Sequence, residues 1–178
     1  IKPKFIEIAQ GEISFVVNKE DEIDIGLFDH RSSHKFYQQL KQLEHPGLVL
    51  FSSGSTGESK AIVHDLSKVL KKFTTPRSSY RTISFLLYDH FGGINTMLYT
   101  LSNAGCLVTL PDRNPDTVLG AIEQYQVEML PTSPTFINLI LFSEAYRRYN
   151  LDSLRLVTYG TEPMPESTLK RFTEIFPK

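Results

Sequence analysis

Residues 48–64 read Leu-Val-Leu-Phe-Ser-Ser-Gly-Ser-Thr-Gly-Glu-Ser-Lys-Ala-Ile-Val-His, two short apolar runs separated by a loop of small and hydroxyl-bearing residues. A lysine, Lys60, ends this loop just before the second apolar run begins at Ala61. Small residues let backbone N–H groups approach an anion, hydroxyl groups add hydrogen-bond donors, and a lysine supplies positive charge. The stretch therefore predicts a loop that binds phosphate.

After this stretch, short apolar segments alternate with amphipathic ones that have the spacing of a helix. The predicted strands are residues 48–51, 80–88, 106–110, 127–130 and 154–158. Asn114, Pro115 and Asp116 predict a helix start, because they offer a capping side chain, a first-turn proline and a favourable acid. This order indicates an α/β fold with a mainly parallel sheet and helices on both faces.

Three unusual loops follow predicted strands, at residues 52–60, 89–93 and 159–163. Ligands of such sheets bind outside the carboxyl ends of the strands. We therefore expect one layout of the sheet to bring all three loops to the same edge.

The chain is predicted to form a single domain, with residues 1–47 as a leading segment and residues 48–178 as the core. In the leading segment we expect a strand at residues 12–17 and a turn or surface loop at 18–24. A helix is expected at 31–43, capped by Ser32 or Ser33.

Composition narrows the function classes. With 178 residues, 40% hydrophobic content and a net charge of −1, the chain is typical of an ordinary globular protein and gives no general reason to expect nucleic acid as a partner. The lone Cys106, predicted to be an inert core residue, cannot form an intramolecular disulfide and favours a cytoplasmic setting.

No apolar run approaches the roughly 20 residues of a membrane span. Because the chain begins at Ile1, we expect a processed protein or a piece of a longer one.

Two common phosphate-binding motifs are absent from the loop. A Walker A loop requires Gly-Lys followed by Ser or Thr, whereas Gly57 precedes Glu58 and Lys60 precedes Ala61. The dinucleotide fingerprint Gly-x-Gly-x-x-Gly is also missing. The pattern present, Ser-Ser-Gly-Ser-Thr-Gly-x-x-Lys, resembles the phosphate loop of the adenylate-forming superfamily of acyl-CoA synthetases, adenylation domains and luciferases. It departs from the usual pattern at Ser59 and Ala61.

Three further segments resemble the same superfamily in the expected order. Residues 88–93, Tyr-Asp-His-Phe-Gly-Gly, are similar to the start of its carboxylate pocket. Residues 131–134, Pro-Thr-Ser-Pro, resemble the motif that precedes its buried helix, and residues 154–164 resemble the segment that packs on adenine. The likeness covers about residues 48–178 and identifies this region as a central piece of the superfamily's large N-terminal domain.

The resemblance implies roles for particular residues. The loop would hold the β- and γ-phosphates of ATP, Lys60 would balance charge as pyrophosphate leaves, and His90 would sit beside the substrate carboxylate. The implied catalytic residues are thus Lys60 and His90. The implied nucleotide-binding residues are Ser52, Ser53, Gly54, Ser55, Thr56, Gly57, Lys60, Gly160, Thr161, Glu162 and Pro163.

The implied reaction is ATP-dependent conversion of a carboxylic acid into an acyl-adenylate, followed by transfer to the thiol of coenzyme A. ATP, Mg²⁺ and CoA are the implied cofactors. The magnesium ligand and the mobile C-terminal domain of the superfamily are expected outside this chain, so we expect the 178 residues alone to be inactive. Two alternatives stay open: an adenylation domain that loads a carrier-protein thiol with an amino or aryl acid, and a non-catalytic nucleotide-binding or interaction module.

Overall fold

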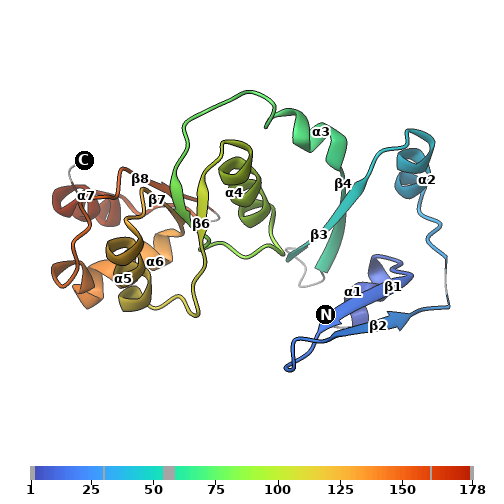
Figure 1. Ribbon diagram of the computed structural model, residues 1–178, viewed down its shortest axis with the longest axis horizontal. Helices are drawn as coiled ribbons and strands as arrows, with labels where there is room; N and C mark the ends of the chain where they lie inside the picture. The colour runs from blue at the N-terminus through green and yellow to red at the C-terminus, as the bar shows by residue number, and fades with distance from the viewer. Residues whose placement is uncertain (1–2, 30, 54–58, 161, 177–178) are drawn as a thin grey trace. The chain divides into compact units, whose positions relative to one another are not determined.

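The computed structural model describes residues 3–29, 31–53, 59–160 and 162–176 (Figure 1). The chain divides into two compact units, Ile1–Lys72 and Phe73–Lys178. Five of the predicted nucleotide-binding residues, Gly54, Ser55, Thr56, Gly57 and Thr161, lie outside the described residues.

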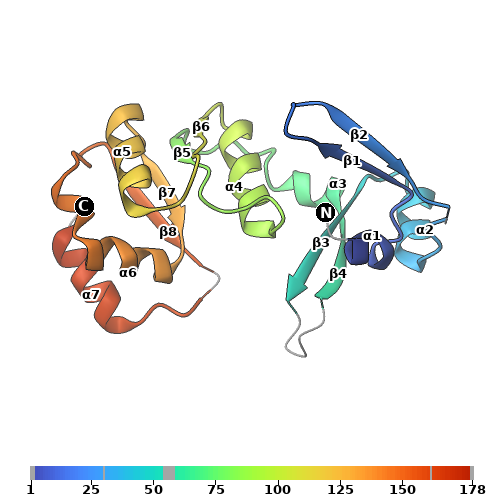
Figure 2. The ribbon, with the colours of Figure 1, turned by 90° about the horizontal axis from the view of Figure 1, so that it is seen from below.

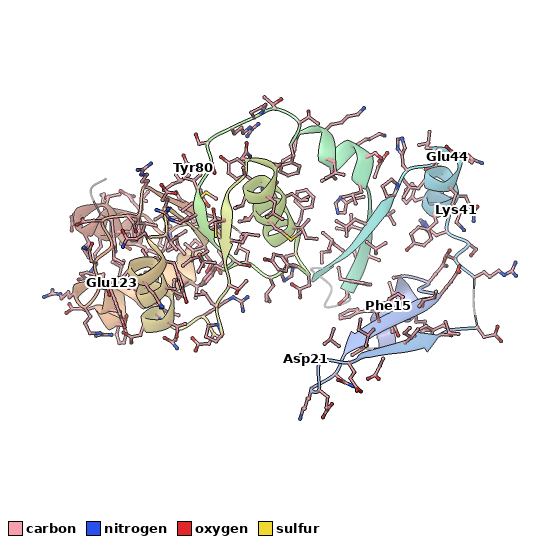
Figure 3. The ribbon with its side chains drawn as sticks, in the orientation of Figure 1. Phe15, Asp21, Lys41, Glu44, Tyr80 and Glu123 are labelled. Carbon is pink, nitrogen blue, oxygen red and sulfur yellow. The ribbon has the colours of Figure 1, made fainter. Side chains whose placement is uncertain are left out.

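The first unit contains two antiparallel hairpins and three short helices. Its elements are α1 (Pro3–Ile8), β1 (Ile13–Val17), β2 (Ile23–Leu27), α2 (Lys35–Gln42), β3 (Gly47–Ser53), β4 (Ser59–Asp65) and α3 (Leu66–Lys71). The predicted strand at 12–17 is confirmed as β1. The predicted turn at 18–24 is too long, because the Asn18 side chain accepts the N–H groups of Glu20 and Glu22, closing the turn before β2. Asp21 lies at its tip (Figure 3).

Helix α2 starts later than predicted, at Lys35, and its cap is His34. Ser32 and Ser33 do not cap it because they are bound elsewhere. The Ser32 N–H and hydroxyl donate to the Glu12 carboxylate, and the Ser33 N–H donates to the side-chain oxygen of Gln10. These bonds tie the entry to α2 to the segment between α1 and β1.

The strand predicted at 48–51 forms, but it does not belong to the parallel sheet. As β3, it pairs antiparallel with β4, from Gly47 opposite Asp65 to Ser53 opposite Ser59. Only five residues separate the two strands, which suits an antiparallel hairpin, whereas parallel strands need a crossover of a dozen residues or more. Asp65 then caps α3 by accepting the N–H of Lys68.

The second unit is built on a four-stranded parallel sheet in the order β6-β5-β7-β8. Its elements are β5 (Arg81–Ile83), α4 (Phe91–Ser102), β6 (Cys106–Val108), α5 (Pro115–Tyr125), β7 (Met129–Thr132), α6 (Pro134–Ser143), a 3₁₀ turn η1 (Ala145–Arg147), β8 (Leu156–Tyr159) and α7 (Glu166–Ile175). The chain moves one way along the sheet through α4 and the other way through α5 and α6, so right-handed crossovers place these helices on opposite faces. Figures 1 and 2 show this arrangement, and the predicted α/β fold is confirmed.

The core of this unit lies between the sheet and α5 and α6. Ile83 and Leu130 from the strands pack with Val118 and Leu119 of α5 and Phe136 of α6. The predicted start of α5 is confirmed, with the Asn114 side chain accepting the Thr117 N–H. A second cluster joins α6 to α7 through Ile137, Leu141 and Phe172.

One burial prediction in this unit is wrong. Cys106 is exposed rather than in the core, because it begins β6 and burial is complete only at Val108. Helix α6 is buried on one side only, since Leu139 and Phe142 remain 47% and 88% exposed. An apolar composition all round a helix therefore does not by itself define which faces are covered.

Asp116, in the first turn of α5, should make the folded chain sensitive to acid. Its carboxylate accepts hydrogen bonds from Arg148 Nη2 at 2.6 Å and from the Tyr149 hydroxyl at 3.0 Å, and these bonds lower the pKa of Asp116 below its ordinary value of 3.8. Because the folded-state pKa lies below the unfolded one, the stabilisation is complete above the unfolded value and is lost as the pH falls through the folded value.

We therefore expect the thermal unfolding midpoint to fall between pH 5 and about pH 3, with a smaller decrease in the variant Asp116→Asn. Asp21→Asn is the matched control, because Asp21 is exposed and forms no ion pair with any other described residue. Equal acid sensitivity in Asp116→Asn and the unmodified chain would contradict this assignment.

Candidate functional site

The end of the β3–β4 hairpin brings Lys60 next to the predicted phosphate loop. Lys60 lies directly opposite Ser52 in the antiparallel register, and Ser53 lies opposite Ser59. Opposite residues of such a ladder have Cβ atoms about 5 Å apart. Ser52 is half-buried and Lys60 is exposed. A hydroxyl group and an ammonium group thus flank the two ends of residues 54–58.

His90 lies beyond the carboxyl end of β5, where it is the N-cap residue of α4. Its side chain makes no capping hydrogen bond, and its Nε2 is 3.6 Å from the Asp89 carboxylate. The side chains of His90 and Asp89 are 63% and 70% exposed. The imidazole is therefore available for contacts with a ligand at this edge of the sheet.

Two other chain segments meet at the carboxyl edge. The hydroxyl of Thr135, in the first turn of α6, donates to the carboxylate of Glu162, which follows β8. Gly160 directly follows β8, and no atom lies within 4 Å of the position that a Cβ would occupy there. Pro163 is exposed. Strands β5, β7 and β8 are parallel, so the segments that follow them share one edge of the sheet, as predicted for 89–93 and 159–163.

The sequence pattern did not single out Thr135 or Thr132 as site residues. Thr132 ends β7, is 1% exposed, and its hydroxyl oxygen has no hydrogen-bond partner among the described residues. A buried hydroxyl group is normally hydrogen-bonded. The signal that could have found both residues is the run Pro-Thr-Ser-Pro-Thr at 131–135, which places three hydroxyl groups at the end of one strand.

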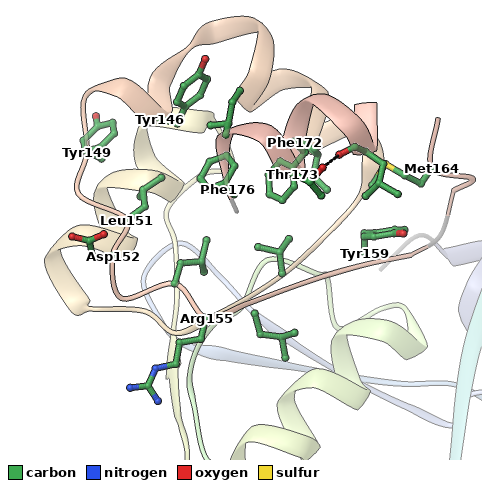
Figure 4. A pocket seen from close by; sticks show the side chains of 16 residues that line it. Tyr146, Tyr149, Leu151, Asp152, Arg155, Tyr159, Met164, Phe172, Thr173 and Phe176 are labelled. Atoms are coloured by element: carbon green, nitrogen blue, oxygen red, sulfur yellow. Dashed lines mark hydrogen bonds between the residues drawn. The ribbon is translucent and has the colours of Figure 1, made fainter. Parts of the chain in front are cut away.

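A pocket of about 510 Å³ lies between β8 and α7 in the second unit (Figure 4). Its walls are mainly apolar and aromatic, including Tyr146, Phe172 and Phe176. Tyr159 and Met164, which flank residues 160–163, contribute to its lining. Asp152 and Arg155 are its charged lining residues. Apart from this border with the predicted adenine segment, the pocket gathers none of the predicted site residues.

The parts of the chain that the structure describes contain neither a metal-binding cluster nor a membrane-spanning helix. No group of three or more His, Cys, Asp or Glu side chains there is placed to hold a metal ion. No helix in these parts is both long and apolar enough to cross a bilayer.

Comparison with known proteins gives a family match over nearly the whole chain. The family described as AMP-binding enzyme matches residues 6–178. A 4-coumarate–CoA ligase-like 9 protein of Arabidopsis thaliana is 30% identical over 160 residues, which cover 84% of this chain and 28% of that protein. The nonribosomal peptide synthetase atnA of Emericella nidulans is 29% identical over 174 residues, covering 92% of this chain and 2% of the synthetase.

A solved structure shares the fold. The luciferase-like enzyme from the nonluminescent mealworm Zophobas morio superimposes with a TM-score of 0.61 and 27% sequence identity, covering 73% of this chain and 32% of that enzyme. The chain thus spans about a quarter to a third of the ligase-like and luciferase-like proteins that it matches.

Proposed function

The chain belongs to the AMP-binding enzyme family, and from this premise we propose that it carries the phosphate-binding and part of the substrate-binding surface of an adenylate-forming ligase. The observation that carries the proposal is the hairpin register that sets Lys60 opposite Ser52 beside the Gly-Ser-Thr-Gly sequence. This pairing places one cation and one hydroxyl donor on the two strands that border the loop, an arrangement suited to a polyphosphate.

In the proposed reaction, a carboxylate oxygen of the substrate attacks the α-phosphorus of ATP. The bond from this phosphorus to the oxygen that bridges to the β-phosphorus breaks, giving acyl-AMP and pyrophosphate. Charge develops on the departing pyrophosphate, and a positioned ammonium group stabilises it. We assign that role to Lys60, together with hydroxyl donors such as Ser52 and Ser53.

His90 is proposed to lie beside the substrate carboxylate, where its exposed imidazole can donate a hydrogen bond. Gly160, Thr161, Glu162 and Pro163 are proposed to line the adenine site. The Thr135–Glu162 hydrogen bond supports this assignment, because it fixes the segment after β8 against the start of α6. In this arrangement the Glu162 carboxylate orients the loop.

The second step is proposed to be attack of a thiol sulfur on the acyl carbonyl carbon, with AMP as the leaving group. The ligase-like relative favours coenzyme A as the thiol, and the match to a nonribosomal peptide synthetase favours a carrier-protein thiol as the second candidate. Mg²⁺ would neutralise phosphate charge when bound, and its protein ligand is proposed, from the family resemblance, to lie outside this chain. The C-terminal domain of the superfamily is likewise proposed to lie outside these 178 residues.

The proposal is tested by ATP–pyrophosphate exchange with the longest natural form of this protein and a panel of fatty, aromatic and amino acids. We expect exchange with at least one class of acid, and none from the isolated 178-residue chain. The acceptor is then identified by supplying coenzyme A or a phosphopantetheinylated carrier protein. Absence of exchange with every acid, in a folded preparation that binds no ATP, would refute the proposed reaction.

A further inference from the structure

Strands β1 and β2 form a two-stranded hairpin with one strongly apolar face. Directly opposite residues of an antiparallel pair share a face of the sheet, and so do alternate residues along each strand. Three opposite pairs of large apolar residues follow this rule: Ile13 with Leu27, Phe15 with Ile25, and Val17 with Ile23. All six side chains therefore lie on one side, which we call the apolar face of the β1–β2 hairpin. Figure 3 labels Phe15, on the first strand.

The apolar face is open to solvent in the first unit. Its six side chains are each 53–78% exposed, whereas Ser14 and Gly26 on the opposite face are half-buried. A two-stranded hairpin is only marginally stable in water unless its apolar face packs against another element. A contiguous exposed apolar surface of this kind marks an interaction site.

The size of the apolar face indicates what kind of partner it can hold. A standard interface between two separate proteins involves about 20–30 residues on each side. Six residues are too few to hold an independent partner or a second copy of this chain firmly. A segment of the same polypeptide needs less contact area, because its covalent tether gives it a high effective concentration.

The turn that closes the hairpin adds a charge to one end of this surface. Residues 19–22 read Lys-Glu-Asp-Glu, and all four are exposed. The acidic turn repels an anionic membrane surface, which would otherwise suit an apolar face. It favours a partner that carries basic residues beside its apolar ones.

The relatives offer enough chain to supply such a partner, since the alignment covers only 28% of the ligase-like protein of Arabidopsis thaliana. We propose that the apolar face of the β1–β2 hairpin is the docking surface for a segment of the same polypeptide outside residues 1–178. This segment is apolar where it meets the face and basic where it meets the acidic turn. The docking involves no nucleotide, so its test is independent of the proposed adenylation.

Thiol labelling, resolved by peptide mass spectrometry, measures whether the face is covered. Ile25→Cys places a thiol on the apolar face, and Asp24→Cys is the matched control on the opposite face of the same strand. In the longest natural form of the protein, labelling at position 25 should be slower than in the 178-residue chain by about tenfold or more, because a covered thiol reacts only after local opening. Labelling at position 24 should be similar in both forms.

Phe15→Ser tests the same face through stability. In the longer form it removes a buried aromatic side chain, so the thermal unfolding midpoint should fall by several degrees. In the 178-residue chain Phe15 is already exposed, and the midpoint should change little. Val16→Ser is the matched control, because Val16 lies on the opposite face and should have a similar effect in both forms. Equal effects of Phe15→Ser in the two forms would overturn the proposal.

The labelling rates also separate the other possible occupants. Equal rates at position 25 in both forms would show that the additional chain leaves the face open, which overturns the proposal. Slow labelling in the 178-residue chain would overturn it as well: a rate that rises on dilution identifies a second copy, and a rate independent of concentration places the cover within these residues. In the longer form, Glu20→Lys should accelerate labelling at position 25, and an unchanged rate would overturn the proposed basic partner.

Discussion

Gly93→Ala should destabilise the second unit by about 3 kcal/mol or more, the upper range for overpacking a buried position. Gly93 is buried in the first turn of α4, and a Cβ built on it would lie 2.0 Å from the carbonyl oxygen of Leu87 and 2.8 Å from that of Leu86. Both atoms belong to the backbone, so no side chain can rotate to make room. The segment 86–90 must shift, and His90 with it.

Gly120→Ala is the matched control for this prediction. Gly120 also lies in a helix, α5, but its Cβ would meet only the ring of Tyr149 at 3.4 Å, an ordinary contact. Alanine in a helix interior is favoured over glycine by about 0.5–1 kcal/mol, so this variant should be neutral or slightly stabilised. Denaturant unfolding of the two variants measures the difference. Similar unfolding midpoints for Gly93→Ala and Gly120→Ala would contradict the prediction, because they would show that residues 86–90 shift at little cost in stability.

The parallel sheet and several helix starts could be predicted because their signals are local. Asn114 before Pro115 and Ser133 before Pro134 each combine a capping side chain with a proline in the first turn, and both residues cap their helices. Apolar runs after these helices located β7 and β8 to within two residues. At these helix starts and strands, the structure favoured by the local sequence is the one that the folded chain adopts.

The pairing of β3 could not be read from its own residues. An apolar strand followed by a glycine loop looks the same whether the chain turns back on itself or crosses over to a parallel strand. The difference lies in β4, whose residues alternate between half-buried and exposed over its first five positions, as in a hairpin with one covered face. The late start of α2 has a similar cause, since Glu12 binds Ser32 from 20 residues away and Gln10 binds Ser33 from 23 residues away.

The candidate site was also predictable only where its residues lie in one short segment of the sequence. Lys60 and Ser52 were proposed from the sequence because a charged and a hydroxyl-bearing residue flank a glycine loop, and the hairpin places them opposite each other. The partner of Glu162 was not found, because Thr135 lies 27 residues earlier and its hydroxyl reaches Glu162 only once β7 and β8 pair. A contact such as Thr135–Glu162, which joins two distant segments, can be identified only from the three-dimensional structure.

Lys60→Ala should reduce the affinity of the 178-residue chain for ATP by about 10- to 100-fold, the range for losing a hydrogen bond between charged groups. The register opposite Ser52 places the ammonium next to the loop that would hold the β- and γ-phosphates. AMP lacks those phosphates, so its affinity should change little, and the ratio of ATP to AMP affinity is the diagnostic quantity. Isothermal titration calorimetry with both nucleotides measures it.

Two further variants decide which property of Lys60 matters. Lys60→Arg keeps the positive charge and should retain most of the ATP affinity. Lys19→Ala removes one positive charge, as Lys60→Ala does, but at a position outside the β3–β4 hairpin. It should therefore change neither the ATP nor the AMP affinity. Equal losses for ATP and AMP in Lys60→Ala would place the lysine near the α-phosphate instead. Unchanged ATP binding would remove Lys60 from the phosphate site, and the glycine loop would then hold the nucleotide through backbone N–H groups alone.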